Sequence, residues 1–299
     1  MSSPDESRFD PRLYVDREEH QDQLRQMILK QSEIRALFVS DVSGQGKSDL
    51  LLRLRLNCLE NQPRAAVLLT DLRDLTTPFS AVERAYRNDQ NVDTYADHFA
   101  EFCAVYERWS STASVRFDGS PGADIVVEAN NARVGPNASV IGQVVTATAP
   151  GVDNRPAQLE SLRAFDNDLR SAHDLPLVLL IDHYNRAELP VRTWIDEKLL
   201  RPCLLGELDN VLVVLASTPD TKPSYAPELD RFVTCQPLAR LEEDPVRVEN
   251  LLRAHGLLFD DSPDYFVTLA VDVLSGGKEI SDLMSFFPLL NRLAVPNGG

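Results

Sequence analysis

A glycine-containing segment followed by a lysine and a serine is the stretch of the sequence best equipped for chemistry. Residues 41–48 read Asp-Val-Ser-Gly-Gln-Gly-Lys-Ser; they follow an apolar run, Ile34–Ser40, and lead into a leucine-rich run with helical spacing, Lys47–Cys58. A strand, a tight turn and a helix in this order direct backbone N–H groups and a helix N-terminus at one anion. Lys47 would neutralise phosphate charge, and the Ser48 hydroxyl would hold Mg²⁺. The segment therefore predicts a site for the phosphates of a nucleotide.

The same segment differs at one position from the usual phosphate-binding pattern, Gly-x-x-x-x-Gly-Lys-Ser/Thr. Asp41 stands where the first glycine is expected. Aspartate can adopt the left-handed and turn conformations that glycine favours, but its carboxylate would lie close to the phosphates and lower the affinity. The alternative is a chance Gly-Lys-Ser sequence at an unrelated strand–helix junction. The residues expected to contact the nucleotide are Ser43, Gly44, Gln45, Gly46, Lys47, Ser48 and Asp49.

A second candidate residue ends the most apolar run of the chain. Asp182 directly follows Leu175–Ile181, and a carboxylate at the end of a buried strand can reach Mg²⁺ through a water. Lys47 and Asp182 are accordingly the candidate catalytic residues, and Ser48 and Asp182 are the candidate metal-binding residues. The alternative is an aspartate that only caps the following turn.

The residues after Asp182 argue against efficient hydrolysis. A carboxylate close behind such an aspartate usually orients the attacking water. The chain continues instead with His183-Tyr-Asn-Arg186, and the nearest acidic residue is Glu188. We therefore expect nucleotide binding with weak or absent turnover, which leaves open whether the protein is an enzyme that hydrolyses NTP.

Apolar runs alternate with helical patterns from residue 14 to residue 241. Runs without polar alternation are predicted to be strands at 34–40, 64–71, 175–182, 210–217 and 231–237. Such runs are typical of parallel strands covered on both faces, and their alternation with helices predicts an α/β fold with a doubly wound parallel sheet. Residues 242–299 have only helical patterns and are expected to form a helical lid subdomain.

Two segments depart from this alternation. Residues 110–155 are rich in Ser, Ala, Val, Asn, Gly and Pro. Short apolar–polar alternations around a turn predict that this segment is a β-hairpin-like insertion within the α/β region 14–241. A disordered linker is the alternative. Residues 1–13 are polar and acidic and are expected to form a flexible leader.

Taken together, these segments resemble the STAND group of P-loop NTPases, relatives of the AAA+ ATPases that include the NACHT and NB-ARC switches. Tyr14-Val-Asp-Arg-Glu18 is similar to the motif with which domains of this family begin, and the resemblance implies that Val15 and Arg17 lie at the adenine. Residues 211–218 stand in the place of the family's sensor strand, which implies a nucleotide contact for Thr218.

The lid region agrees with the family only in part. Pro237-Leu-Ala-Arg-Leu241 is similar to the start of the family's helical lid, but the expected Gly-Gly-x-Pro turn reads Gly276-Gly-Lys-Glu279. Asp41 and the missing carboxylate after Asp182 are two further departures. All three favour a degenerate or inactive member of the group.

The resemblance implies ATP or ADP with Mg²⁺ as ligands, and a regulatory switch that controls an effector protein, either separate or fused in a longer chain. Bacterial defence or signalling is the expected setting, and homo-oligomerisation is left open. A nucleotide-free scaffold that binds a partner protein through residues 110–155 is the alternative from a different functional class. A metabolic kinase is a weaker third, because nothing in the chain resembles a small-substrate site.

Composition excludes several other classes of protein. The chain has 46 acidic and 30 basic residues and a net charge of −16, which disfavours nucleic acid or an anionic membrane as the main partner. No apolar run approaches the ~18 residues of a membrane span, and the first residues are unlike a signal peptide. The four cysteines are far apart, which argues against zinc-ribbon and disulfide scaffolds. We expect a cytoplasmic protein with no nucleic-acid or membrane partner.

Overall fold

The computed structural model describes residues 17–42, 45–60, 64–89, 98–112, 155–171, 174–238, 245–254 and 263–275. Its centre is a five-stranded sheet in the order β2-β3-β4-β1-β5, in which every neighbouring pair of strands is parallel. The strands are β1 (Ala36–Ser40), β2 (Ala66–Asp71), β3 (Leu177–Asp182), β4 (Val211–Ser217) and β5 (Val233–Gln236). Every residue of β3 and β4 is buried, as expected for strands covered on both faces. The predicted α/β fold with a parallel sheet is confirmed.

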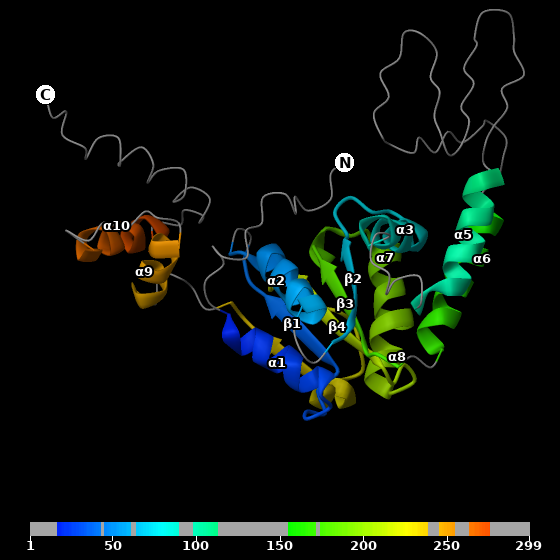
Figure 1. Ribbon diagram of the computed structural model, residues 1–299, viewed down its shortest axis with the longest axis horizontal. Helices are drawn as coiled ribbons and strands as arrows, with labels where there is room; N and C mark the ends of the chain where they lie inside the picture. Colours follow the sequence, from blue (N-terminus) through cyan, green and yellow to red (C-terminus); the bar gives the residue numbers. More distant parts are fainter. Residues whose placement is uncertain are drawn as a thin grey trace, which may run out of the picture. The chain divides into compact units, whose positions relative to one another are not determined.

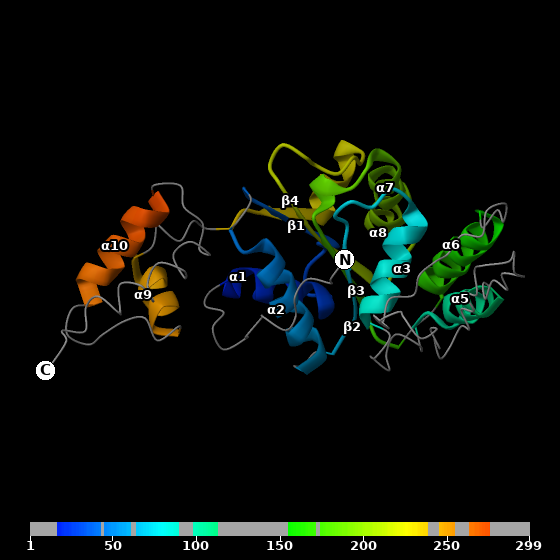
Figure 2. The same ribbon diagram turned by 90° about the horizontal axis from the view of Figure 1, so that it is seen from above.

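Helices cover both faces of this sheet, as Figures 1 and 2 show. Helices α1 (Glu18–Ile28) and α2 (Lys47–Glu60) lie on one face, and α7 (Leu189–Trp194) and α8 (Arg201–Leu205) lie on the other. Alternate strand residues point at α1 and α2, so that one core unites the three elements. It includes Leu24 and Met27 of α1, Leu50, Leu51 and Leu54 of α2, and Leu37, Val39, Val178, Leu180 and Val214 of the sheet.

The connections between β2, β3, β4 and β5 contain several shorter or less regular helical segments. Helix α3 (Pro78–Asp89) follows β2, and the 3₁₀ turn η2 (Tyr184–Arg186) follows β3. Between α7 and α8 lies η3 (Ile195–Leu200), which is a π-helix. Together α7, η3 and α8 form a continuous helical run of three parts. The 3₁₀ segment η4 (Pro227–Phe232) precedes β5.

Residues 92–171 form a compact unit distinct from residues 1–91 and 172–299. Its described part is a pair of packed helices, α5 (Ala100–Thr112) and α6 (Arg155–Arg170). The ring of Phe99 stacks on that of Phe165, with centroids 5.0 Å apart, and Phe102 meets Phe165 edge-on. Residues 110–112 and 155 are therefore helical and do not belong to the predicted β-like insertion. The rest of that segment, 113–154, lies outside the described residues, as does the predicted leader.

The C-terminal described segments are two helices with their own small core. Helices α9 (Pro245–Ala254) and α10 (Pro263–Ser275) pack together through Val248, Leu252, Val267, Ala270 and Leu274. Both helices lie in the region 242–299 that was predicted to be helical, and residues 276–299 of that region lie outside the described residues. No helix in the described part of the chain combines the length and the apolar character needed to cross a membrane.

Candidate nucleotide-binding site

The carboxyl ends of the parallel strands lie at one edge of the sheet because the strands run in the same direction. Asp71 ends β2 and Asp182 ends β3, and the two residues are paired in the register of neighbouring strands. Ser40 at the end of β1 is likewise paired with Ser217 at the end of β4. Ligands of open α/β sheets bind outside the carboxyl ends of the strands, so this edge is where a site is expected.

The loop after β1 turns sharply into helix α2. Gly46 has a φ of 82°, a left-handed conformation that glycine adopts without the steric cost of a side chain. Lys47 is the first residue of α2, a helix of 14 residues, and the amide of Leu50 donates to the Gly46 carbonyl. The first amides of a helix have no acceptor within it and carry partial positive charge. The start of α2 is therefore equipped to bind an anion through backbone groups.

The side chain of Lys47 is turned back into this loop. Its ammonium donates hydrogen bonds to the backbone carbonyls of Asp41 and Val42, each at 2.6 Å. Burial lowers the pKa of Lys47 below its usual value, and the charges of Asp41 and Asp182 offset part of this effect. Because the charge of Asp182 influences the pKa of Lys47, the two predicted motifs lie near each other at this edge of the sheet.

Asp41 does not use the left-handed conformation expected at the first glycine position. Among the described residues, the non-glycine residues with positive φ are Arg17, Lys30, Asp74 and His183. Asp41 is buried, and its Oδ1 accepts a hydrogen bond from the amide of Val42 at 2.7 Å. Its own amide donates to the Ser217 carbonyl at 3.3 Å. The Asp41 side chain thus accepts a hydrogen bond from the loop backbone, a contact that glycine cannot make.

His183 stands directly behind Asp182, where a hydrolytic carboxylate would be expected. Its φ of 55° is left-handed, and its amide donates to Asp182 Oδ1 at 2.8 Å. Its Nδ1 lies 3.1 Å from Asp182 Oδ2 and 3.3 Å from Asp71 Oδ1, without hydrogen-bond geometry to either oxygen. Burial lowers the pKa of His183, but the two carboxylates outweigh burial and raise it to about 9. The two carboxylates thus favour the protonated form of the imidazole.

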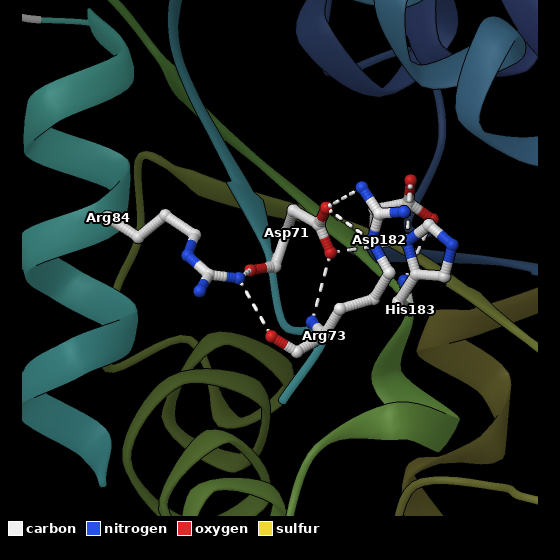
Figure 3. A network of polar contacts seen from close by, with 5 residues as sticks. All are labelled: Asp71, Arg73, Arg84, Asp182 and His183. Carbon is white, nitrogen blue, oxygen red and sulfur yellow. Dashed lines mark hydrogen bonds and ion pairs between the residues drawn. The ribbon is translucent and has the colours of Figure 1, made fainter. Parts of the chain in front are cut away.

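Asp71 is the centre of a polar network that the sequence did not indicate (Figure 3). The guanidinium of Arg73 contacts Asp71 Oδ2, with Nε at 2.8 Å, and the Arg73 amide donates to Oδ1 at 3.0 Å. Arg84 of α3 donates to the carbonyls of Asp71 and Arg73, at 2.8 and 2.9 Å. Burial raises the pKa of Asp71, but the contacts with His183 and Arg73 lower it by more, so that this pKa lies well below its usual range. The signal available in the sequence was an acid closing the second strand as Asp182 closes the third.

A second buried network begins one residue after His183. The Tyr184 hydroxyl lies 2.8 Å from both carboxylate oxygens of Asp196, which belongs to the π-helix η3. The amide of Ser224, in the segment after β4, donates to Asp196 Oδ2 at 3.0 Å. Burial raises the pKa of Asp196, and the hydrogen bonds from Ser224 and Tyr184 oppose this shift. The network ties the turn after β3 to the connection after β4.

The structure describes some, but not all, of the other residues that were predicted to contact the nucleotide. Arg17 is buried at the N-terminus of α1 with a φ of 86°. Thr218 follows β4, where its side chain hydrogen-bonds to Asp220 and lowers the pKa of that acid. Gln45 and Ser48 are half-buried beside Lys47. Burial and the charge of Asp182 raise the pKa of Asp49. Three predicted residues lie outside the described part of the chain: Val15, Ser43 and Gly44.

A magnesium ion at this edge would depend on few protein ligands. Within the described residues, no group of three or more His, Cys, Asp or Glu side chains could hold a metal ion. Mg²⁺ at phosphate sites is usually bound by one or two protein oxygens together with the phosphates and water. Ser48 and Asp182 are the oxygen-bearing residues in the predicted positions.

Comparisons with known proteins give similarity in fold only. No family model matches the sequence, and the search of curated proteins found no match. Among solved structures, Cdc6p from Pyrobaculum aerophilum is 14% identical with a TM-score of 0.46; the alignment covers 90% of this chain and 58% of that one. The Drosophila ORC bound to DNA is 12% identical with a TM-score of 0.42, over 91% of this chain and 57% of that one. The chain thus spans less than two thirds of either protein, and similarity at this level carries no information about its ligands or partners.

Proposed function

We propose that the chain is a nucleotide-binding regulatory module of the STAND type, which takes ATP or ADP at residues 41–48 and controls an effector protein. The observation that carries the proposal is the convergence of Lys47, at the start of α2, with Asp182, at the end of β3. The left-handed Gly46 and the amide end of α2 support it, because together they form a cradle for an anion.

Each of these groups has a defined role in the proposal. The Lys47 ammonium leaves the carbonyls of Asp41 and Val42 and neutralises the β- and γ-phosphates, while the first amides of α2 hold their oxygens. Ser48 and Asp182 would hold Mg²⁺, which supplies charge neutralisation between the phosphates. Hydrolysis is expected to be weak or absent, because His183 stands where a water-orienting carboxylate is needed. Arg17 and Thr218 are proposed to contact the nucleotide away from its phosphates.

The regulatory part of the proposal concerns partners. A nucleotide-dependent change in the module would act on an effector protein, separate or fused in a longer chain, and homo-oligomers are one form in which it would do so. The net charge of −16 supports a protein partner over nucleic acid.

Thermal unfolding with and without nucleotide tests the binding site. A ligand at ~100 times its Kd adds about 2.7 kcal/mol of stability, which raises Tm on the order of 5 °C for a protein of this size. We expect this shift for the wild type with Mg-ATP or Mg-ADP, and none for Lys47→Ala.

Lys30→Ala is the matched control. Lys30 pairs with Asp209, 3.8 Å away, and Asp209 lies two residues before β4, at the opposite edge of the sheet. This variant should keep the full nucleotide shift. A wild type whose Tm does not respond to millimolar nucleotide would refute the proposal and favour the nucleotide-free scaffold. If the wild type does show the shift, phosphate release at saturating ATP measures its turnover, which we expect to be near background.

A further inference from the structure

The side chain of Gln236, the last residue of β5, carries a buried acceptor without a donor. In the described part of the chain, Gln236 Oε1 is the only buried side-chain oxygen that has no hydrogen-bond partner. A buried carbonyl oxygen left without a donor costs free energy, and native proteins leave few such atoms unpaired. This acceptor therefore indicates a donor that arrives with a ligand.

The sheet places this acceptor at the same edge as the phosphate loop. Gln236 is paired with Val39 of the parallel strand β1, two residues before Asp41. Paired residues of neighbouring parallel strands point to the same face of a sheet, and Val39 packs in the core that α1 and α2 share. Leu238, two residues after Gln236, is buried in the same core. Gln236 thus lies on the face that carries α2, one strand, about 4.8 Å, from β1.

The order of the strands separates the two ends of a bound nucleotide. Strands β3 and β5 lie on opposite sides of β1, in the order β3-β4-β1-β5. In the proposed site the terminal phosphates face Asp182, at the end of β3. A nucleotide held in this direction by Lys47 directs its base to the other side of the loop, toward β5. Gln236 is therefore on the side of the base.

We infer that Gln236 selects adenine, because its Oε1 accepts a hydrogen bond from the exocyclic amino group of this base. The inference rests on the proposed nucleotide-binding function and adds to it the residue that distinguishes ATP and ADP from guanine nucleotides. Adenine carries an amino donor at the position where guanine carries a carbonyl oxygen. Guanine would therefore bring a second acceptor to Oε1, whereas adenine supplies the missing donor.

Calorimetric titration of the full chain in Mg²⁺ tests the inference with three nucleotides. These are ATP, GTP and purine riboside 5′-triphosphate, which differs from ATP only by the absence of the amino group. For the wild type we expect the analogue and GTP to bind at least tenfold more weakly than ATP. Gln236→Met removes the acceptor and keeps an unbranched side chain of similar length. This variant should bind all three nucleotides within about threefold of one another.

Thr234→Val is the matched control. Thr234 lies two residues before Gln236 on the same face of β5 and is half-buried like it. This variant should keep the tenfold preference for ATP, because it leaves the amide of Gln236 in place. Unfolding curves without nucleotide report whether each variant is folded, and the comparison of the three nucleotides on the wild type needs no variant.

Two results would overturn the inference. One is a wild type that binds GTP or the purine analogue as tightly as ATP. The other is a folded Gln236→Met that keeps a tenfold preference for ATP. A wild type that binds none of the three nucleotides would overturn the proposed function as well, and its flat thermal response to Mg-ATP would identify that case.

Discussion

The hydroxyl of Tyr184 lies 2.8 Å from both carboxylate oxygens of Asp196, in a region where both side chains are buried. Tyr184→Phe removes this contact and leaves the carboxylate with the Ser224 amide. Hydrogen bonds to buried charged groups contribute about 1.5–3 kcal/mol, so we expect the free energy of unfolding to fall by that amount. Urea unfolding at pH 7 measures it.

Tyr225→Phe is the matched control for this change. Tyr225 is half-buried, and its hydroxyl hydrogen-bonds to the exposed Asp230. Its removal should cost less than about 1 kcal/mol, because solvent can replace the partner. Equal costs for the two variants would contradict the assignment of a buried network around Asp196.

Asp41 should affect affinity and stability in opposite directions. Asp41→Gly removes a carboxylate from the phosphate loop, so nucleotide should bind more tightly. The same change removes the acceptor for the Val42 amide and adds freedom to the unfolded chain, which lowers stability by about 0.5–1 kcal/mol. Calorimetric Kd values and urea unfolding separate the two effects.

Asp41→Asn distinguishes charge from backbone contact. Asparagine keeps an oxygen that can accept from the Val42 amide, and it carries no charge. We expect it to bind nucleotide more tightly than the wild type while keeping most of the stability. If neither substitution changes Kd, the carboxylate of Asp41 does not oppose phosphate binding.

The sheet was predictable from the sequence because its strands are apolar without alternation. Every residue of β3 and β4 is buried, and short runs of that kind, separated by helical patterns, are typical of parallel strands with helices on both faces. Helix α3 was not predicted, although the sequence contains a signal for its start. It starts at Pro78, and the Thr77 hydroxyl accepts from the Ser80 amide, the Ser/Thr cap followed by proline that commonly begins a helix.

The polar networks were not predictable, because they depend on strand order. Asp71 and Asp182 are 111 positions apart in sequence and become neighbours only because β2 pairs with β3. Local spacing carries no such information. The Tyr184–Asp196 contact depends on the π-helix η3, whose register differs from that of a regular α-helix and is not predicted by α-helical spacing of apolar residues.

The imidazole of His183 should titrate far above its usual range. Burial alone would lower its pKa, but Asp182 and Asp71 raise it from 6.5 to about 9. Since the folded-state pKa is raised, the associated stability is fully present below about pH 6.5 and is lost as pH rises through 9. At about 1.4 kcal/mol per pKa unit, this contribution is at most about 3 kcal/mol.

Two measurements check the titration, both in EDTA and without nucleotide. Imidazole NMR signals should place the pKa of His183 near 9, and Asp71→Asn should lower it. Urea unfolding between pH 6 and pH 9.5 should show a loss of stability in the wild type that His183→Asn lacks. A midpoint close to 6.5 would show that the two carboxylates do not hold the proton.

Asp168 should stabilise the helix pair α5–α6 by capping α5 from its partner helix. Its buried carboxylate accepts hydrogen bonds from the amides of Phe102, at 2.8 Å, and Glu101, at 3.3 Å. These are first-turn amides without acceptors in their own helix. Asp168→Ala should therefore lower the stability of the pair by about 1–2 kcal/mol.

The effect should stay within residues 92–171, because they form a compact unit of their own. Hydrogen exchange should accelerate for amides in the first two turns of α5 and remain unchanged in β3 and β4. Asp166→Ala is the control, since Asp166 makes an exposed pair with Arg170 one turn along α6, and such pairs contribute about 0.5 kcal/mol or less. Equal acceleration in both variants would mean that the Asp168 carboxylate does not act as a cap.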